Sequence, residues 1–188
     1  MTPIQQLMLG AGGAAEKTYM DDVFSTYLYK GTGVSSQVRN TGINLTEFGG
    51  LVWAKRRNGG HEHGLYDTIR GIGKRLSSNN TAAQETTSNG VQSFSSTGFT
   101  HGQDDDIGGN NDTYASWTFR KAPGFFDVKT FTGQSNSFPV VNHDLGCIPG
   151  LVIYKKTSGA DDWYVWHRDF HVHSHVSVSY THLRAHET

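Results

Sequence analysis

Alternation between apolar and polar positions, without a helical period, organises this chain of 188 residues. Residues 113–121 (TYASWTFRK) show it best, because Ala115, Trp117 and Phe119 alternate with more polar positions. Similar short stretches between turn signals predict further strands at 22–30, 36–45, 51–56, 64–70 and 91–99. Many short strands at regular spacing predict an all-β fold, an antiparallel two-sheet sandwich.

A hairpin is predicted around the turn signal at 58–60 (NGG), which joins the strand at 51–56 to a return strand at 64–70. Trp53 on the first of these strands and Trp117 on the long strand alternate with apolar neighbours. Both indole rings are therefore expected to lie in the core.

One stretch of the chain recurs, because GLVWAKR at 50–56 returns one hundred residues later as GLVIYKK at 150–156. Further matches follow in order at offsets that drift from 102 to 98: Tyr29 with Phe131, Leu45 with Leu145, Tyr66 with Tyr164, and Arg70 with Arg168. A unit that recurs in order is a modular structural element. The sequence therefore predicts repeated sandwiches rather than a single catalytic pocket.

The repeat divides the chain into four parts. Residues 1–21 are predicted to be an N-terminal arm, 22–121 a complete β-sandwich domain, and 122–176 a truncated second repeat. Residues 177–188 are interpreted as a non-native tail, because they resemble a translated sequencing-adapter tail found at the ends of metagenome-assembled proteins. The partial second β unit is expected to be the less ordered half, since most partners of its core are missing.

Composition narrows the functional classes. Sixteen Lys and Arg stand against 17 Asp and Glu, so the formal net charge of −1 predicts no binding of nucleic acid. Cys147 is alone, which excludes an internal disulfide framework, and it is expected to be a small buried side chain. No apolar run reaches membrane-spanning length and no signal peptide is recognised, so synthesis in a cytoplasm without membrane insertion is expected.

Acidic side chains alternate through the polar loop at 103–112, where Asp104, Asp106 and Asp112 could supply oxygen ligands to calcium. The EF-hand pattern fails, because Gly108 and Ala115 occupy two positions at which it requires ligands. The loop is therefore interpreted first as a solvated hairpin loop, and the three aspartates are weak candidates for a lectin-like metal site.

Histidines at alternate positions suggest a second metal site, since His171, His173 and His175 would share one face of a strand. A closed coordination sphere usually draws its ligands from separate elements, and the cluster adjoins the segment interpreted as a non-native tail. An artefact or a solvated strand is therefore favoured over a metal site. No nucleophile elbow, phosphate-binding loop or catalytic carboxylate pair is recognised. The chain is predicted not to be an enzyme and to need no cofactor.

Trp166 is the candidate residue for glycan binding. The repeat alignment at an offset of 98 places it opposite Thr68, so it has no apolar counterpart in the first unit. It is therefore expected to be exposed, where an indole ring can stack on a sugar ring.

Four longer stretches carry a resemblance to a known family: KTYMDDVFST at 17–26, DTIRG at 67–71, KRLSSN at 74–79 and YASWTFRKAPGFFD at 114–127. Together with PIQQ at 3–6 they resemble tail-fibre-like, repeat-bearing structural proteins of tailed bacteriophages, especially marine ones. The resemblance covers nearly all of residues 3–170. It implies sandwiches of concanavalin or jelly-roll type and a role in the virion, and it carries no catalytic residue to this chain.

The expected function is that of a bacteriophage virion protein, tail-fibre-like, which serves as a spacer or as a host-surface adhesion module. Its expected partners are other virion proteins and further copies of itself, with a host-surface glycan as a candidate ligand. The alternative is a carbohydrate-binding module of a glycan-degrading system.

Overall fold

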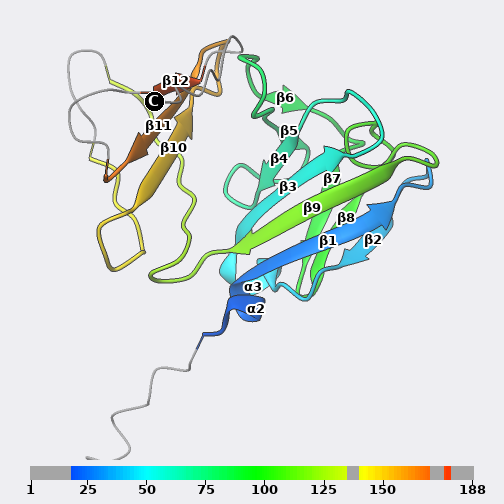
Figure 1. The fold of residues 1–188 in the computed structure, drawn as a ribbon, viewed down its shortest axis with the longest axis horizontal. Helices are drawn as coiled ribbons and strands as arrows, with labels where there is room; N and C mark the ends of the chain where they lie inside the picture. Colours follow the sequence, from blue (N-terminus) through cyan, green and yellow to red (C-terminus); the bar gives the residue numbers. More distant parts are fainter. Residues whose placement is uncertain (1–17, 135–139, 170–175, 179–188) are drawn as a thin grey trace, which may run out of the picture.

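The computed structural model describes residues 18–134, 140–169 and 176–178. Two antiparallel sheets, formed by strands between residues 24 and 120, pack face to face (Figure 1). The all-β sandwich predicted from the sequence is confirmed. The larger sheet has the order β1 (Phe24–Lys30), β9 (Thr113–Arg120), β3 (Gly50–Arg56) and β4 (Gly64–Asp67). The smaller sheet has the order β2 (Gln37–Asn40), β8 (Gly98–His101) and β7 (Val91–Ser95).

Short elements connect these strands. The helical turn α2 (Met20–Val23) precedes β1, and the two-stranded pair β5 (Lys74–Arg75) and β6 (Glu85–Thr86) follows β4. A second turn, α3 (Leu45–Phe48), begins where the Asn44 side chain accepts a hydrogen bond from the Glu47 N–H at 3.1 Å. It ends at Gly49, whose φ of 75° lies in the left-handed region.

The core lies between the two sheets. Tyr114, Ser116 and Thr118 of β9 point into it and are fully buried, whereas Ala115 and Trp117 belong to the outer face. The alternation predicted along β9 is therefore confirmed, and its more polar face is the inner one. The core cluster consists of Tyr29, Ile43, Leu45, Val52, Ala54, Tyr66, Val91, Phe99, Ile107 and Tyr114.

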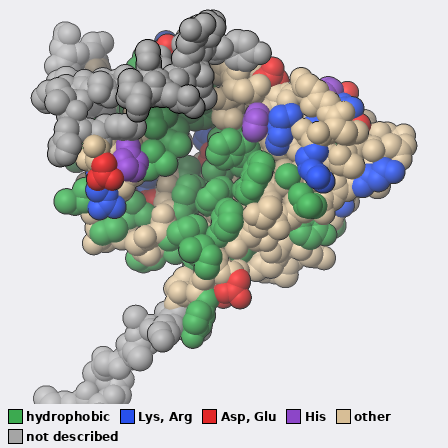
Figure 2. Space-filling model, viewed as in Figure 1, with side chains coloured by type: hydrophobic (Ala, Val, Ile, Leu, Met, Phe, Trp, Pro, Cys, Tyr) green, Lys and Arg blue, Asp and Glu red, His purple; other side chains and the backbone are tan. Residues whose placement is uncertain are grey.

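The expectation that Trp53 and Trp117 lie in this core is wrong. Both belong to the outer face of the larger sheet, where their rings meet edge to face with centroids 6.0 Å apart. The reason is strand parity, because Val52 and Ala54 occupy the inward positions of β3 and leave Trp53 half-buried outside. Figure 2 shows hydrophobic side chains gathered across the middle of the viewed face, over β9 and its neighbours.

A further antiparallel sheet follows, with the order β10 (Leu151–Lys155), β11 (Trp163–His167) and β12 (Val176–Val178). It lies beside the β4 to β6 region of the sandwich (Figure 1). The segment interpreted as a non-native tail from 177 onward thus begins within β12. Cys147 is exposed, so the expectation that it is buried is wrong. None of the helices in the described ranges has the length and apolar character needed to cross a bilayer.

Candidate functional site

The hairpin β10–β11 repeats the hairpin β3–β4 in the same register. Val52 pairs with Tyr66 in the first hairpin, and Val152 pairs with Trp166 in the second. The offset of 100 also holds beyond these strands, because the isolated bridge between Leu65 and Leu76 recurs as the pairing of Val165 with Val176.

Backbone hydrogen bonds at the hairpin ends repeat at the same offset. The Thr68 N–H donates to the Gly50 carbonyl at 3.0 Å, and the Arg168 N–H donates to the Gly150 carbonyl at 3.0 Å. Trp166 is therefore the counterpart of Tyr66, and its alignment with Thr68 is corrected. The similarity of Tyr66 with Tyr164 had shifted the alignment by two residues, a shift that keeps the side-chain face but changes the partner.

Trp166 is exposed, as predicted, with 40% of its surface accessible. The register changes how this exposure is interpreted, because Tyr66, the counterpart of Trp166, is completely buried in the sandwich core. Val152 beside it is 38% exposed, whereas its counterpart Val52 is also completely buried. The face that carries Trp166 is thus the one that the first unit uses as its core face.

Two tyrosines extend this face along the hairpin. Tyr154 and Tyr164 pair across β10 and β11, and their rings stack with centroids 4.9 Å apart and planes 10° apart. Together with Val152 and Trp166 they define the aromatic face of the second hairpin. Such a face can stack on a flat apolar ligand or pack against another sheet.

The opposite face of the second hairpin is anchored to the sandwich by Trp163. Its side chain is buried against Leu65 and Leu76, and its indole Nε1–H donates to the Ser77 carbonyl at 2.9 Å. Residue-by-residue correspondence places Trp163 at the position of His63. The sequence showed Trp163 only as one of four tryptophans, and its position on the outer face of a repeated hairpin is the signal that identifies its role.

Backbone hydrogen bonds secure the same contact between the turn of the second hairpin and the loop after β5. The Gln84 N–H donates to the Thr157 carbonyl at 3.0 Å, and the Asp161 N–H donates to the Thr81 carbonyl at 2.9 Å. Lys155 Nζ also donates to the Thr81 carbonyl at 3.2 Å. The two units are thus joined by side-chain packing and by main-chain hydrogen bonds.

The three candidate calcium ligands bind basic side chains in two separate places. Asp106 is buried, forms an ion pair with Arg75, and lies 3.3 Å from His61 Nδ1. Asp104 lies 3.8 Å from the same Arg75. Asp112 instead pairs with Arg56, at 2.6 Å between Oδ1 and Nη2.

These ion pairs fix the loop before β9 to the hairpin β3–β4 and to β5, and they leave the three carboxylates without a common centre. Within the described ranges, no group of three or more His, Cys, Asp or Glu side chains is placed to hold a metal ion. His171, His173 and His175 lie outside the described residues.

A buried polar network holds the other side of that loop. His101 is fully buried, its Nε2 lies 3.0 Å from Arg39 Nε, and its Nδ1 lies 2.8 Å from the Gly102 carbonyl. The Arg39 guanidinium lies over the Tyr29 ring, 4.4 Å from its centroid, and the Tyr29 hydroxyl donates to the Ile107 carbonyl. Burial lowers the pKa of His101 to about 4, with the hydrogen bond to Gly102 opposing this shift and the Arg39 charge adding to it. The ring is therefore neutral at pH 7.

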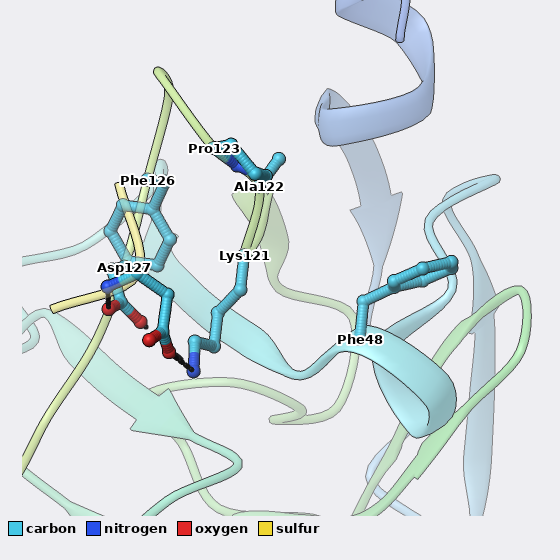
Figure 3. A pocket seen from close by; sticks show the side chains of 7 residues that line it. Phe48, Lys121, Ala122, Pro123, Phe126 and Asp127 are labelled. Carbon is cyan, nitrogen blue, oxygen red and sulfur yellow. Dashed lines mark hydrogen bonds and ion pairs between the residues drawn. The ribbon is translucent and has the colours of Figure 1, made fainter. Parts of the chain in front are cut away.

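An open pocket of about 200 Å³ lies where β9 leaves the sandwich (Figure 3). Lys121 points into it and pairs with Asp127 at 3.0 Å, and Asp144 lies 3.6 Å from the same ammonium. Burial raises the pKa of Asp127, but hydrogen bonds from the Asp144 N–H and Lys121, with the Lys121 and Lys129 charges, outweigh it, so the pKa lies below its ordinary value. The pocket is lined by Phe48, Lys121, Ala122, Pro123, Phe126, Asp127 and Asp144.

Comparison with known families places the sandwich in one of them. Residues 20–125 match the family described as a domain of unknown function, DUF7483. The chain belongs to this family. No curated protein and no solved structure matches the chain. The DUF7483 match covers every strand from β1 to β9, whereas the second hairpin lies outside the matched residues and is related to it by the internal repeat.

Proposed function

We propose that this DUF7483 protein is a structural component of a bacteriophage virion, tail-fibre-like, whose repeated β units serve as spacers or as host-surface adhesion modules. The observation that carries the proposal is the second hairpin, which repeats β3–β4 in register and is fixed to the sandwich by Trp163. Repeated units that contact their neighbours through the same elements build extended, quasi-one-dimensional assemblies. The resemblance of four sequence stretches to phage structural proteins supports the same role.

The ion pairs of two buried carboxylates support a structural rather than a catalytic role. The buried carboxylates Asp67 and Asp106 form ion pairs with Arg70 and Arg75. Asp67 also caps a turn, because its Oδ1 atom accepts hydrogen bonds from the Ile69 and Arg70 N–H groups. Through these contacts both carboxylates hold loops in place. We therefore propose a non-enzymatic protein that acts in the virion with other virion proteins and further copies of itself.

Mass spectrometry of purified virions tests this proposal directly. Virions that carry the gene are banded by density, washed and digested, and peptides from both the sandwich and the second hairpin are quantified against a major capsid protein. We expect both sets of peptides at a constant ratio to capsid across the band. Their absence from intact particles, with the protein present in the infected-cell lysate, would overturn the virion role.

A carbohydrate-binding module is the second candidate, and the aromatic face favours it. Trp166 is exposed beside the stacked pair Tyr154 and Tyr164, an arrangement that suits stacking on sugar rings. A glycan array tests it with the wild-type chain and Trp166→Ala, each with and without a chelator. Binding that survives chelation but is lost in Trp166→Ala supports a stacking site. Binding that requires calcium would instead support a metal site at Asp104, Asp106 and Asp112.

A further inference from the structure

The second hairpin has a sheet edge that its counterpart in the first unit does not have. In the first unit β3 lies between β9 and β4, whereas β10 is the last strand of its sheet within the described residues. Three consecutive apolar residues lie on it, and Leu151, Val152 and Ile153 are 53%, 38% and 51% exposed. An apolar edge of this kind is a template for another strand.

The backbone groups at this edge follow from the printed hydrogen bonds of the repeat. In β3, the Arg57 N–H donates to the Thr113 carbonyl and the Gly49 carbonyl accepts from Lys121, so odd-numbered positions face β9. In the second hairpin the Gly150 carbonyl faces β11, because it accepts from the Arg168 N–H. The alternate positions Leu151, Ile153 and Lys155 therefore present their N–H and C=O groups to the free edge.

The strand β9 indicates what kind of strand fits there. Carried over at the offset of 100, its register would place Phe119 opposite Leu151 and Trp117 opposite Ile153, two apolar pairs on one face. On the aromatic face it would place the small side chain of Ser116 opposite Tyr154. A second copy of β10 fits less well, because antiparallel pairing centred on Ile153 would set Leu151 against Lys155.

We propose that the free edge of β10 accepts an antiparallel strand with the alternation of β9, presented by a partner polypeptide. The added strand extends the β10–β11–β12 sheet by main-chain hydrogen bonds, the mode of recognition called β-augmentation. Its apolar pairs select for large side chains at alternate positions, and its small hydroxyl residues leave room for Tyr154. The inference rests on the repeat geometry and goes beyond the proposed virion role.

A peptide with the sequence of residues 112–121 (DTYASWTFRK) is the probe, titrated against the full chain. Two N-methylated forms provide a matched pair, because β9 directs the Trp117 N–H toward β3 and the Thr118 N–H away from it. We expect the unmodified peptide and the form methylated at Thr118 to bind alike. We expect methylation at Trp117 to weaken binding at least about tenfold. Hydrogen exchange locates the binding, and protection should rise at residues 151–155.

Variants of the protein test the same edge from the other side. Ile153→Pro removes an N–H that faces the free edge and leaves the β10–β11 ladder in place, whereas Ile153→Thr keeps that N–H. Loss of binding in the proline variant alone supports the proposal. Equal binding of both methylated peptides, or no binding of any peptide, would overturn it. A stable dimer protected at 151–155 without peptide would also overturn it, because a second copy would then occupy the edge.

Discussion

The hairpins β3–β4 and β10–β11 have one register and opposite environments. Val52 and Tyr66 are completely buried, whereas Val152 and Trp166 at the same positions are 38% and 40% exposed. The hairpin itself is therefore not what determines burial. In the first unit β9 pairs with β3 and the smaller sheet covers its inner face, and the described part of the second unit has neither partner. A repeat in the sequence preserves register, and neighbouring strands decide which face becomes a core.

A second difference lies beside the aromatic side chain. The Tyr66 ring lies between Gly64 and Gly90, where an added Cβ would come within 2.8 Å and 2.7 Å of ring atoms. Tyr164 stands at the position of Gly64 in the second hairpin, and it stacks on Tyr154 instead. The first unit thus holds one tyrosine in a slot made by glycines, and the second builds a row of aromatic rings.

The largest expected effect tests this contrast directly. Tyr66→Ala should lower the free energy of unfolding by about 3–5 kcal/mol, because it leaves a cavity in a closely packed core. Trp166→Ala should change it by less than about 1 kcal/mol, because the ring is already partly in water. Urea denaturation followed by tryptophan fluorescence and circular dichroism measures both. Similar losses in the two variants would mean that the second hairpin is covered as well as the first.

The next largest effect is a pH dependence confined to the sandwich. His101 has a folded pKa of about 4 and an ordinary pKa near 6.5, so the unfolded chain takes up its proton first as the pH falls. Stability from this residue is fully present above about pH 6.5 and decreases down to about pH 4, by about 3 kcal/mol. His101→Gln should flatten this part of the curve of unfolding free energy against pH. An unchanged slope in that variant would assign the dependence to other groups.

Weakening the contact between the second hairpin and the sandwich should have a smaller effect on stability. Trp163→Ala removes the packing on Leu65 and Leu76 and the hydrogen bond to the Ser77 carbonyl, which we expect to lower the opening free energy of β10 and β11 by about 2 kcal/mol. Hydrogen exchange should show faster exchange at 151–167 with the sandwich unchanged. Trp163→Phe keeps most of the packing and should give about half of the effect. Faster exchange throughout β9 and β3 would show that the second unit supports the first.

The sequence predicted the strands better than their environments. Turn signals and alternation located β1 to β4 and β7 to β9, because both are local properties of a few residues. The two-residue strands β5 and β6 lie outside the strand ranges predicted from the sequence. The side of the sheet that became the core was misjudged at Trp53, since its apolar neighbours favoured the core for the indole ring, whereas Val52 and Ala54 occupy the inward positions of β3. A local pattern distinguishes two faces of a strand, and only the opposite sheet decides which one it covers.

The candidate site shows the same limit. The exposure of Trp166 was predicted for the wrong reason, because an alignment by residue similarity cannot fix a cross-strand partner as hydrogen bonds do. The ion pairs of Asp104, Asp106 and Asp112 join them to Arg75 and Arg56, which are distant in sequence. Spacing within one loop could suggest a metal site there, but it contained no information about these partners.

The smallest expected effect concerns the charged junction at which the chain leaves β9. Asp127 has only 5% of its side chain exposed and contacts Lys121 and Lys129, whereas Asp144 at the same junction is 73% exposed. Since the folded pKa of Asp127 is lowered, its contribution is present above the ordinary carboxyl range and is lost as the pH falls through the folded value. Asp127→Asn should lower the melting temperature slightly at low salt, and Asp144→Asn should lower it less, because exposed ion pairs are screened. High salt should narrow the difference between the two variants. A larger decrease in melting temperature for Asp144→Asn would show instead that the exposed carboxylate contributes more to the stability of the junction.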